Sequence, residues 1–197
     1  VAAKGRLLEY ATHLIDYMIF LNNGARVEWV VGHVHGGEKL GGTHPSPDYA
    51  MAQFGFDNGV RGLLDCGALA PDLPGGNSFW LDAGATMYGS DGYAQAIVGS
   101  GWRALTKSQG FISGKGGFNV DHDQPLYVRD LADWLDDETK VHPCNGDVTY
   151  HGFQAMMAIC ASALDHQRVE LPMRPPEQPL MERMKQELQQ HALRLPT

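Results

Sequence analysis

Apolar residues recur with a helical period near the start of the chain. At about 100° per residue, one side of a helix over residues 5–22 carries Leu7, Leu8, Ala11, Leu14, Ile15, Met18 and Ile19. The other side carries Glu9, His13, Asp16 and Phe20, with Tyr17 at its edge. The pattern predicts an amphipathic helix that ends at Asn23-Gly24, a pair suited to left-handed backbone.

Shorter stretches rich in Val, Trp, Tyr and Phe follow this helix. The predicted strands cover residues 26–34, 49–56, 60–69, 79–88, 93–98 and 102–106. Asp57-Asn58-Gly59 separates the second strand from the third and predicts a hairpin. Linkers rich in Gly and Pro cover residues 36–47 and 71–77.

Helical patterns return in the last third of the chain. One helix is predicted over 126–137, after Pro125, and another over 147–164, with Asn145 or Asp147 as its N-cap. A short strand over 169–171 precedes a tail, residues 175–197, which reads as a loop and an amphipathic helix. The order predicts an α+β fold: a large, mostly antiparallel sheet with helices covering one face.

Composition narrows the class of protein. The chain has 197 residues, 43% hydrophobic and 19% charged, which is typical of one folded domain. A formal net charge of −8 with scattered basic residues argues against a nucleic-acid partner. No stretch approaches the roughly 20 apolar residues of a membrane span. Three cysteines without a C-x-x-C pair indicate reduced thiols and a cytoplasmic location.

Glu9 and His13 lie four residues apart and are therefore neighbours on one helix face. A carboxylate beside an imidazole can fix the imidazole tautomer and raise its basicity, which suits His13 to general acid or base chemistry. On spacing alone, an incidental charge pair on a solvated helix face is the more common explanation.

A resemblance changes that balance. Residues Gly5 to Asp16 resemble the segment that opens the C-terminal domain of the Gfo/Idh/MocA oxidoreductases, whose usual form is Gly-x-Leu-x-Asp-x-Gly-x-His-x-x-Asp. The likeness continues in order through 27–30, 52–60, 89–92, 158–162 and 169–172, so that it covers roughly residues 5–173.

The resemblance implies roles for four residues. His13 would transfer a proton to or from a substrate hydroxyl, aided by a lysine of the N-terminal domain, and Glu9 would be its acidic partner. Tyr17 and Asp16 are assigned to the substrate site, although a structural role is the more common one for Asp16. Glu9 stands where the family usually has Asp, so its carboxylate reaches one methylene further, and Ala11 stands where the family usually has Gly, so its methyl group slightly fills the space beside the site.

No cofactor-binding residue is expected in this chain. Residues Gly99 to Ala104 match G-x-G-x-x-A, but no strand–turn–helix context surrounds them, and 102–106 reads as a strand. The resemblance implies NAD or NADP, bound mainly by an N-terminal Rossmann domain that is absent from this chain. The start at Val1 reads as a cut or processed end.

No metal site is expected either. His33 and His35 share one face of a strand, with His44 nearby, a spacing that zinc sites use. Without a Cys or acidic ligand at a characteristic spacing, an exposed or interfacial pair is favoured. The aromatic residues of the strands, Trp29, Phe54, Phe56 and Trp80, are expected to pack, some of them between subunits.

The combined interpretation assigns residues 1–174 to an oxidoreductase C-terminal domain for substrate binding and oligomerisation, and 175–197 to a helical tail. The parent activity would act on a sugar, cyclitol or polyol hydroxyl, in a homo-oligomer (dimer or tetramer) joined through the sheet. The alternative is a stand-alone oligomerisation or ligand-binding module. In either case the isolated chain is expected to be inactive.

Overall fold

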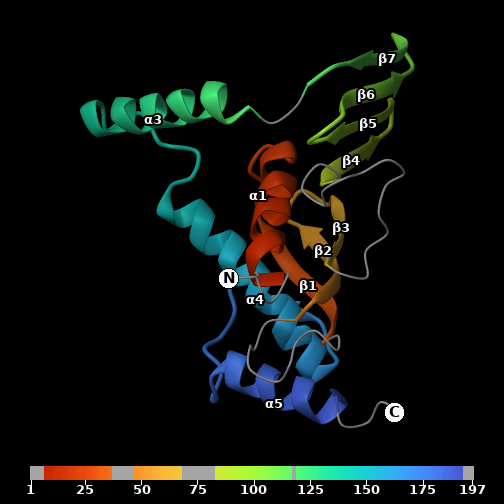
Figure 1. The fold of residues 1–197 in the computed structure, drawn as a ribbon, viewed down its shortest axis with the longest axis vertical. Coiled ribbons are helices and arrows are strands. Elements are labelled where there is room, and N and C mark those ends of the chain that lie inside the picture. Colours follow the sequence, from red (N-terminus) through yellow and green to blue (C-terminus); the bar gives the residue numbers. More distant parts are fainter. Residues whose placement is uncertain (1–6, 37–46, 68–82, 117–118, 193–197) are drawn as a thin grey trace. The chain divides into compact units, whose positions relative to one another are not determined.

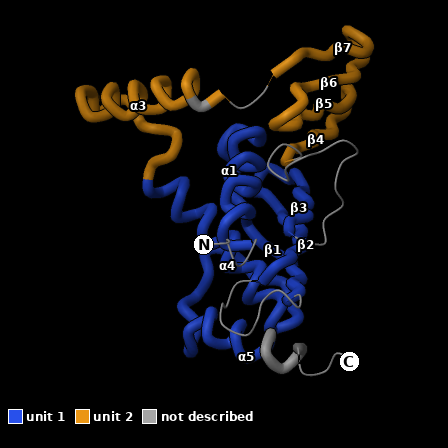
Figure 2. The backbone as a smooth tube through the Cα atoms, viewed as in Figure 1, with its two compact units in different colours: residues 1–70, 146–197 blue, residues 71–145 orange. Residues whose placement is uncertain are grey.

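The computed structural model describes residues 7–36, 47–67, 83–116 and 119–192. The chain divides into two compact units, residues 1–70 with 146–197 and residues 71–145 (Figure 2). Helices and two antiparallel sheets of four strands each make up an α+β fold. The predicted class is therefore confirmed, with the strands shared between two sheets.

The sheet of the first unit has the strand order β3-β2-β1-β8. Figure 1 labels β1, β2 and β3 of this sheet. Its strands are β1 (Val27–His35), β2 (Tyr49–Phe56), β3 (Arg61–Gly67) and β8 (Val169–Glu170). The hairpin predicted around Asp57-Asn58-Gly59 joins β2 to β3. Gly59 has a φ of +86°, a left-handed conformation that glycine adopts without strain.

Helices cover the inner face of this sheet. They are a π-helical turn η1 (Leu7–Ala11), α1 (Thr12–Leu21) and α4 (Gly146–Asp165), while α5 (Leu180–Ala192) packs on α4. The predicted amphipathic pattern is confirmed, because Leu7, Ala11, Ile15 and Ile19 are buried. Helix α4 packs along β1, and α1 and α5 both contact α4.

Two contacts set the distance between α4 and β1. A Cβ built on Gly32 would lie 2.8 Å from the Cα of Ile159, so the strand approaches the helix closer than any side chain permits. The backbone N–H of Gly32 donates to Ser162 Oγ at 2.9 Å, and the hydroxyl of Ser162 donates to the Gln167 carbonyl at 2.6 Å. Ser162 is buried, so it satisfies a strand N–H in the interior.

The second unit contains a four-stranded meander and a helix. The strands are β4 (Gly84–Gly89), β5 (Gly92–Ile97), β6 (Gly101–Thr106) and β7 (Gly110–Gly114). The short, glycine-bounded β7 was not predicted. Among the described residues of this unit, only Ala104 and His142 are buried.

Helix α3 (Val120–Asp136) corrects the prediction of a helix over 126–137. The helix begins before Pro125 because Asn119 caps it. The Asn119 side chain accepts from the His122 N–H at 3.3 Å, and Asp123 accepts from the Asn119 N–H at 3.1 Å. This reciprocal cap satisfies the first backbone donors and outweighs the single hydrogen bond that Pro125 cannot make.

Among the helices that the structure describes, none is both long and apolar enough to cross a lipid bilayer.

Candidate active site

Of the residues that the sequence singled out, Glu9 lies on η1, and His13, Asp16 and Tyr17 lie on α1. Glu9 and His13 are exposed. The Thr12 hydroxyl donates to the Glu9 carbonyl at 3.3 Å. The π-helical turn that carries Glu9 is a rare local form, found frequently at functional sites.

Asp16 and Tyr17 continue this strip one turn further and are partly buried. Burial raises the pKa of the Asp16 carboxyl above its ordinary value of 3.8, and the charge of His13 opposes part of that shift. Of the two acidic residues in this strip, Glu9 is exposed and Asp16 is partly buried. Asp16 also lies near His13, which can carry a positive charge. We call Glu9, His13, Asp16 and Tyr17 the helix-1 strip.

Gly152 on α4 is a residue that the sequence analysis did not single out. A Cβ at this position would lie 2.8 Å from Asp16 Oδ1. The sequence feature that could have identified Gly152 is a glycine inside a helix with strong apolar periodicity. Glycine in a helix interior is about 1 kcal/mol less favourable than alanine, so its presence there indicates that another group approaches the helix closely.

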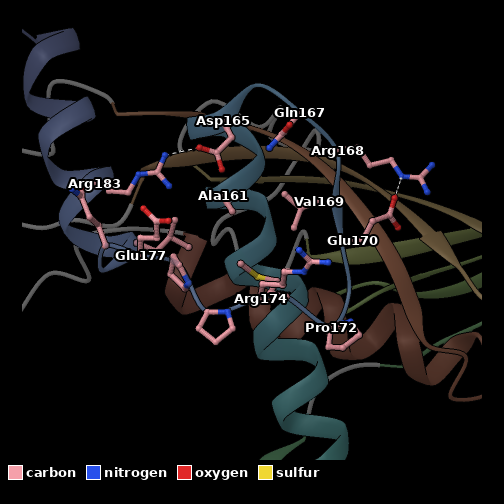
Figure 3. Close-up of a pocket in the computed structure, with 15 residues that line it drawn as sticks. Ala161, Asp165, Gln167, Arg168, Val169, Glu170, Pro172, Arg174, Glu177 and Arg183 are labelled. Atoms are coloured by element: carbon pink, nitrogen blue, oxygen red, sulfur yellow. Dashed lines mark hydrogen bonds and ion pairs between the residues drawn. The ribbon is translucent and has the colours of Figure 1, made fainter.

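A cavity of about 620 Å³ lies elsewhere in the first unit, between the end of α4, β8 and the start of α5 (Figure 3). None of the helix-1 strip residues lines it. Two of its arginines are neutralised, Arg183 by Asp165 at 2.5 Å and Arg168 by Glu170 at 2.6 Å. Its chemistry is that of paired surface charges and offers no acid or base next to a nucleophile.

The G-x-G-x-x-A segment does not fit a dinucleotide. Gly99 and Ser100 form the turn between β5 and β6, and Gly101 begins strand β6, with a φ of +102°. A pyrophosphate site needs these glycines to open a helix, whose N-terminal N–H groups bind the phosphates. The prediction that 102–106 forms a strand is confirmed.

The histidine pair of β1 is exposed on the outer face of the sheet. His33 and His35 both lie there, and His44 lies outside the described residues. Within residues 7–36, 47–67, 83–116 and 119–192, no three His, Cys, Asp or Glu side chains come together in a way that could hold a metal ion.

The outer face of the β3-β2-β1-β8 sheet carries both apolar and charged residues. Leu63 is 79% exposed and Met51 46% exposed. The Trp29 indole lies over Gly55 of the neighbouring strand. The guanidinium of Arg168 lies 4.6 Å and that of Arg61 5.3 Å from the Trp29 ring centroid, which are cation–π distances.

Comparison with known proteins defines the class of fold. The chain has the fold of a Gfo/Idh/MocA-type NAD-dependent oxidoreductase domain, and it spans about half the length of the solved structures described next. No protein-family model matches the sequence, and no curated protein matches it.

Three solved structures illustrate the likeness. An NAD-binding oxidoreductase from Klebsiella pneumoniae is 15% identical, with a TM-score of 0.69 over 87% of this chain and 51% of that one. Levoglucosan dehydrogenase, in complex with NADH and levoglucosan, is 17% identical, with a TM-score of 0.67 over 88% and 52%. The WlbA dehydrogenase from Bordetella pertussis, with NADH and UDP-GlcNAcA, is 20% identical, with a TM-score of 0.58 over 86% and 47%.

Proposed function

We propose that this chain is the C-terminal part of an NAD(P)-dependent oxidoreductase that acts on a hydroxyl group of a sugar, cyclitol or polyol. The observation that carries the proposal is the helix-1 strip, an exposed histidine and carboxylate on the first helix of an oxidoreductase-type fold. Residues 1–174 would form the substrate-binding and oligomerisation domain and 175–197 its tail.

In this proposal His13 exchanges a proton with the reacting hydroxyl. Glu9 orients the imidazole, and Tyr17 and Asp16 complete the substrate side of the strip. Proton transfer by a positioned side chain contributes about 10²- to 10⁴-fold to a rate. The nicotinamide supplies the hydride chemistry.

A carbohydrate-like substrate is supported by the ligands of two similar structures, levoglucosan and UDP-GlcNAcA. The side chain of Glu9 is one methylene longer than the aspartate usual at this position. Its carboxylate therefore reaches further from the helix, which favours a substrate placed differently from that of the usual form.

The cofactor, NAD or NADP, would be bound mainly by a nucleotide-binding domain outside this chain. The described glycine-rich segment at Gly99–Ala104 does not fit a pyrophosphate, as shown above, so we assign no cofactor residue. We also assign no metal ligand.

Turnover tests the proposal. The purified chain, given NAD or NADP and a panel of sugars, cyclitols and polyols, is expected to produce no nicotinamide absorbance change at 340 nm. Supplied with the nucleotide-binding domain encoded by its gene, the protein should turn over a member of the panel. His13→Gln should then lower kcat about 100-fold or more, while His122→Gln, exposed on α3, should not. Turnover by the chain alone, or an active His13→Gln variant, would refute the proposal.

A stand-alone oligomerisation or ligand-binding module is the alternative. The exposed apolar residues of the outer sheet face, Leu63 and Met51, favour self-association through that face. This alternative requires a stable oligomer of the chain by light scattering and no activity in the protein that the complete gene encodes.

A further inference from the structure

Gly152 occupies a position where glycine is unfavourable. It lies inside α4, a helix of 20 residues, and is buried. Glycine in a helix interior is about 1 kcal/mol less favourable than alanine. Two ordinary explanations for such a glycine are a left-handed backbone or close packing of another backbone. Gly152 does not have a positive φ, so the first does not apply.

The atoms around Gly152 exclude the second explanation. Among the described residues, the heavy atoms that an added Cβ would meet within 4 Å are Asp16 Oδ1 at 2.8 Å and Asp16 Cγ at 3.9 Å. At Gly32, by contrast, an added Cβ would meet the backbone of Ile159. The absence of a side chain at Gly152 therefore leaves room for one group, the Asp16 carboxylate.

That carboxylate is held between α1 and α4, one turn beyond His13. Residues three apart on a helix are neighbours on its surface. Burial raises the pKa of Asp16 and the positive charge of His13 opposes this rise, so the two groups interact electrostatically. Glu9 and Tyr17 are the other titratable residues of the strip. On α4 the titratable residues within five positions of Gly152 are Asp147, Tyr150 and His151.

We infer that the missing side chain at Gly152 lets the Asp16 carboxylate pack against α4 beside His13, and that Asp16, on the substrate side of the strip, acts through His13 as a positioning residue. This rests on the proposed function only in giving His13 the acid/base role. A fixed carboxylate here holds a negative charge at one place near His13.

Carboxyl NMR titration of the 197-residue chain, labelled with ¹³C at the aspartate side chains, tests the inference. His13→Gln should raise the pKa of Asp16, because the opposing positive charge is removed. His33→Gln on the outer face of β1 is the matched control and should leave the pKa of Asp16 unchanged. His13 is exposed, so its replacement tests the coupling without disturbing the core.

Gly152→Ala tests whether the missing side chain at position 152 holds the Asp16 carboxylate in place. The methyl group should push the flexible Asp16 side chain toward water, so that the pKa of Asp16 moves down toward 3.8. In this background His13→Gln should have a smaller effect than in the wild-type chain. Gly146→Ala, in the same helix with nothing within 4 Å of its added Cβ, is the control.

The inference is overturned if His13→Gln leaves the pKa of Asp16 unchanged, or if Gly152→Ala does. Amide spectra of each variant establish that it is folded. Neither titration involves cofactor or substrate, so its outcome is separate from that of the proposed reaction. A complete enzyme that is active without His13 would refute the proposed function and leave the measured coupling intact.

Discussion

Ser162 shows how one hydroxyl joins a helix to a strand. It accepts from the Gly32 N–H and donates to the Gln167 carbonyl, and it is buried. Ser162→Ala removes the acceptor and leaves a buried N–H unpaired, so we expect the free energy of unfolding to fall by about 1–3 kcal/mol. Urea denaturation measures this change. Ser100→Ala, in an exposed turn, should change it by less than about 0.5 kcal/mol.

His151 makes stability depend on pH. Its Nε2 accepts from the Val27 N–H at 2.8 Å, so the neutral imidazole is the form that fits. Burial and the charge of Arg26 lower the pKa of His151 below its ordinary value of 6.5, and Asp57 opposes them. The unfolded chain therefore binds more protons, and the stabilisation is complete above 6.5 and lost as pH falls toward the lower pKa of the folded state.

The measurement is urea unfolding at about pH 7.5 and about pH 5.5, on either side of the ordinary histidine value. The wild-type chain should be less stable at the lower pH, and His151→Gln should reduce that difference. His33→Gln, which replaces an exposed histidine, should keep it. An unchanged pH dependence in His151→Gln would contradict the assignment.

At the scale of elements, the contact between α4 and β1 is set by Gly32. An alanine methyl there would lie within 2.8 Å of Ile159 atoms, including backbone that cannot rotate away. We expect Gly32→Ala to lower the free energy of unfolding by about 1–3 kcal/mol, the usual cost of overpacking. Gly146→Ala, whose added methyl meets nothing within 4 Å, is the control. Equal stability of the two variants would show that the strand and helix can separate freely.

At the scale of the whole molecule, the outer sheet face is the proposed contact between copies of the chain. Leu63→Glu places a charge on the edge strand β3 of this face and should weaken self-association, measured as the dimer dissociation constant by sedimentation. Gln186→Glu, exposed on α5, adds the same charge elsewhere and should have no effect. A chain that is monomeric before substitution, or an unaffected Leu63→Glu dimer, would rule out this face.

Much of the architecture could be predicted from local patterns. The period of Leu7, Ala11, Ile15 and Ile19 identified the first helix and its buried face, and Asn58-Gly59 identified the hairpin. The start of α3 was mispredicted because the Asn119 cap outweighed the signal of Pro125. Strand β7 was missed because its five residues, which begin and end with glycine, carry too little alternation to be distinguished from a turn.

The sequence by itself determined that Glu9, His13, Asp16 and Tyr17 share a helix face, because helical periodicity is a local property of the chain. Their order also carried the family resemblance. Only the tertiary structure brought Gly152 against Asp16, since those residues are far apart along the chain and meet where two helices pack. It likewise paired His151 with Val27 and Ser162 with Gly32, contacts that depend on how α4 crosses the sheet rather than on any local pattern.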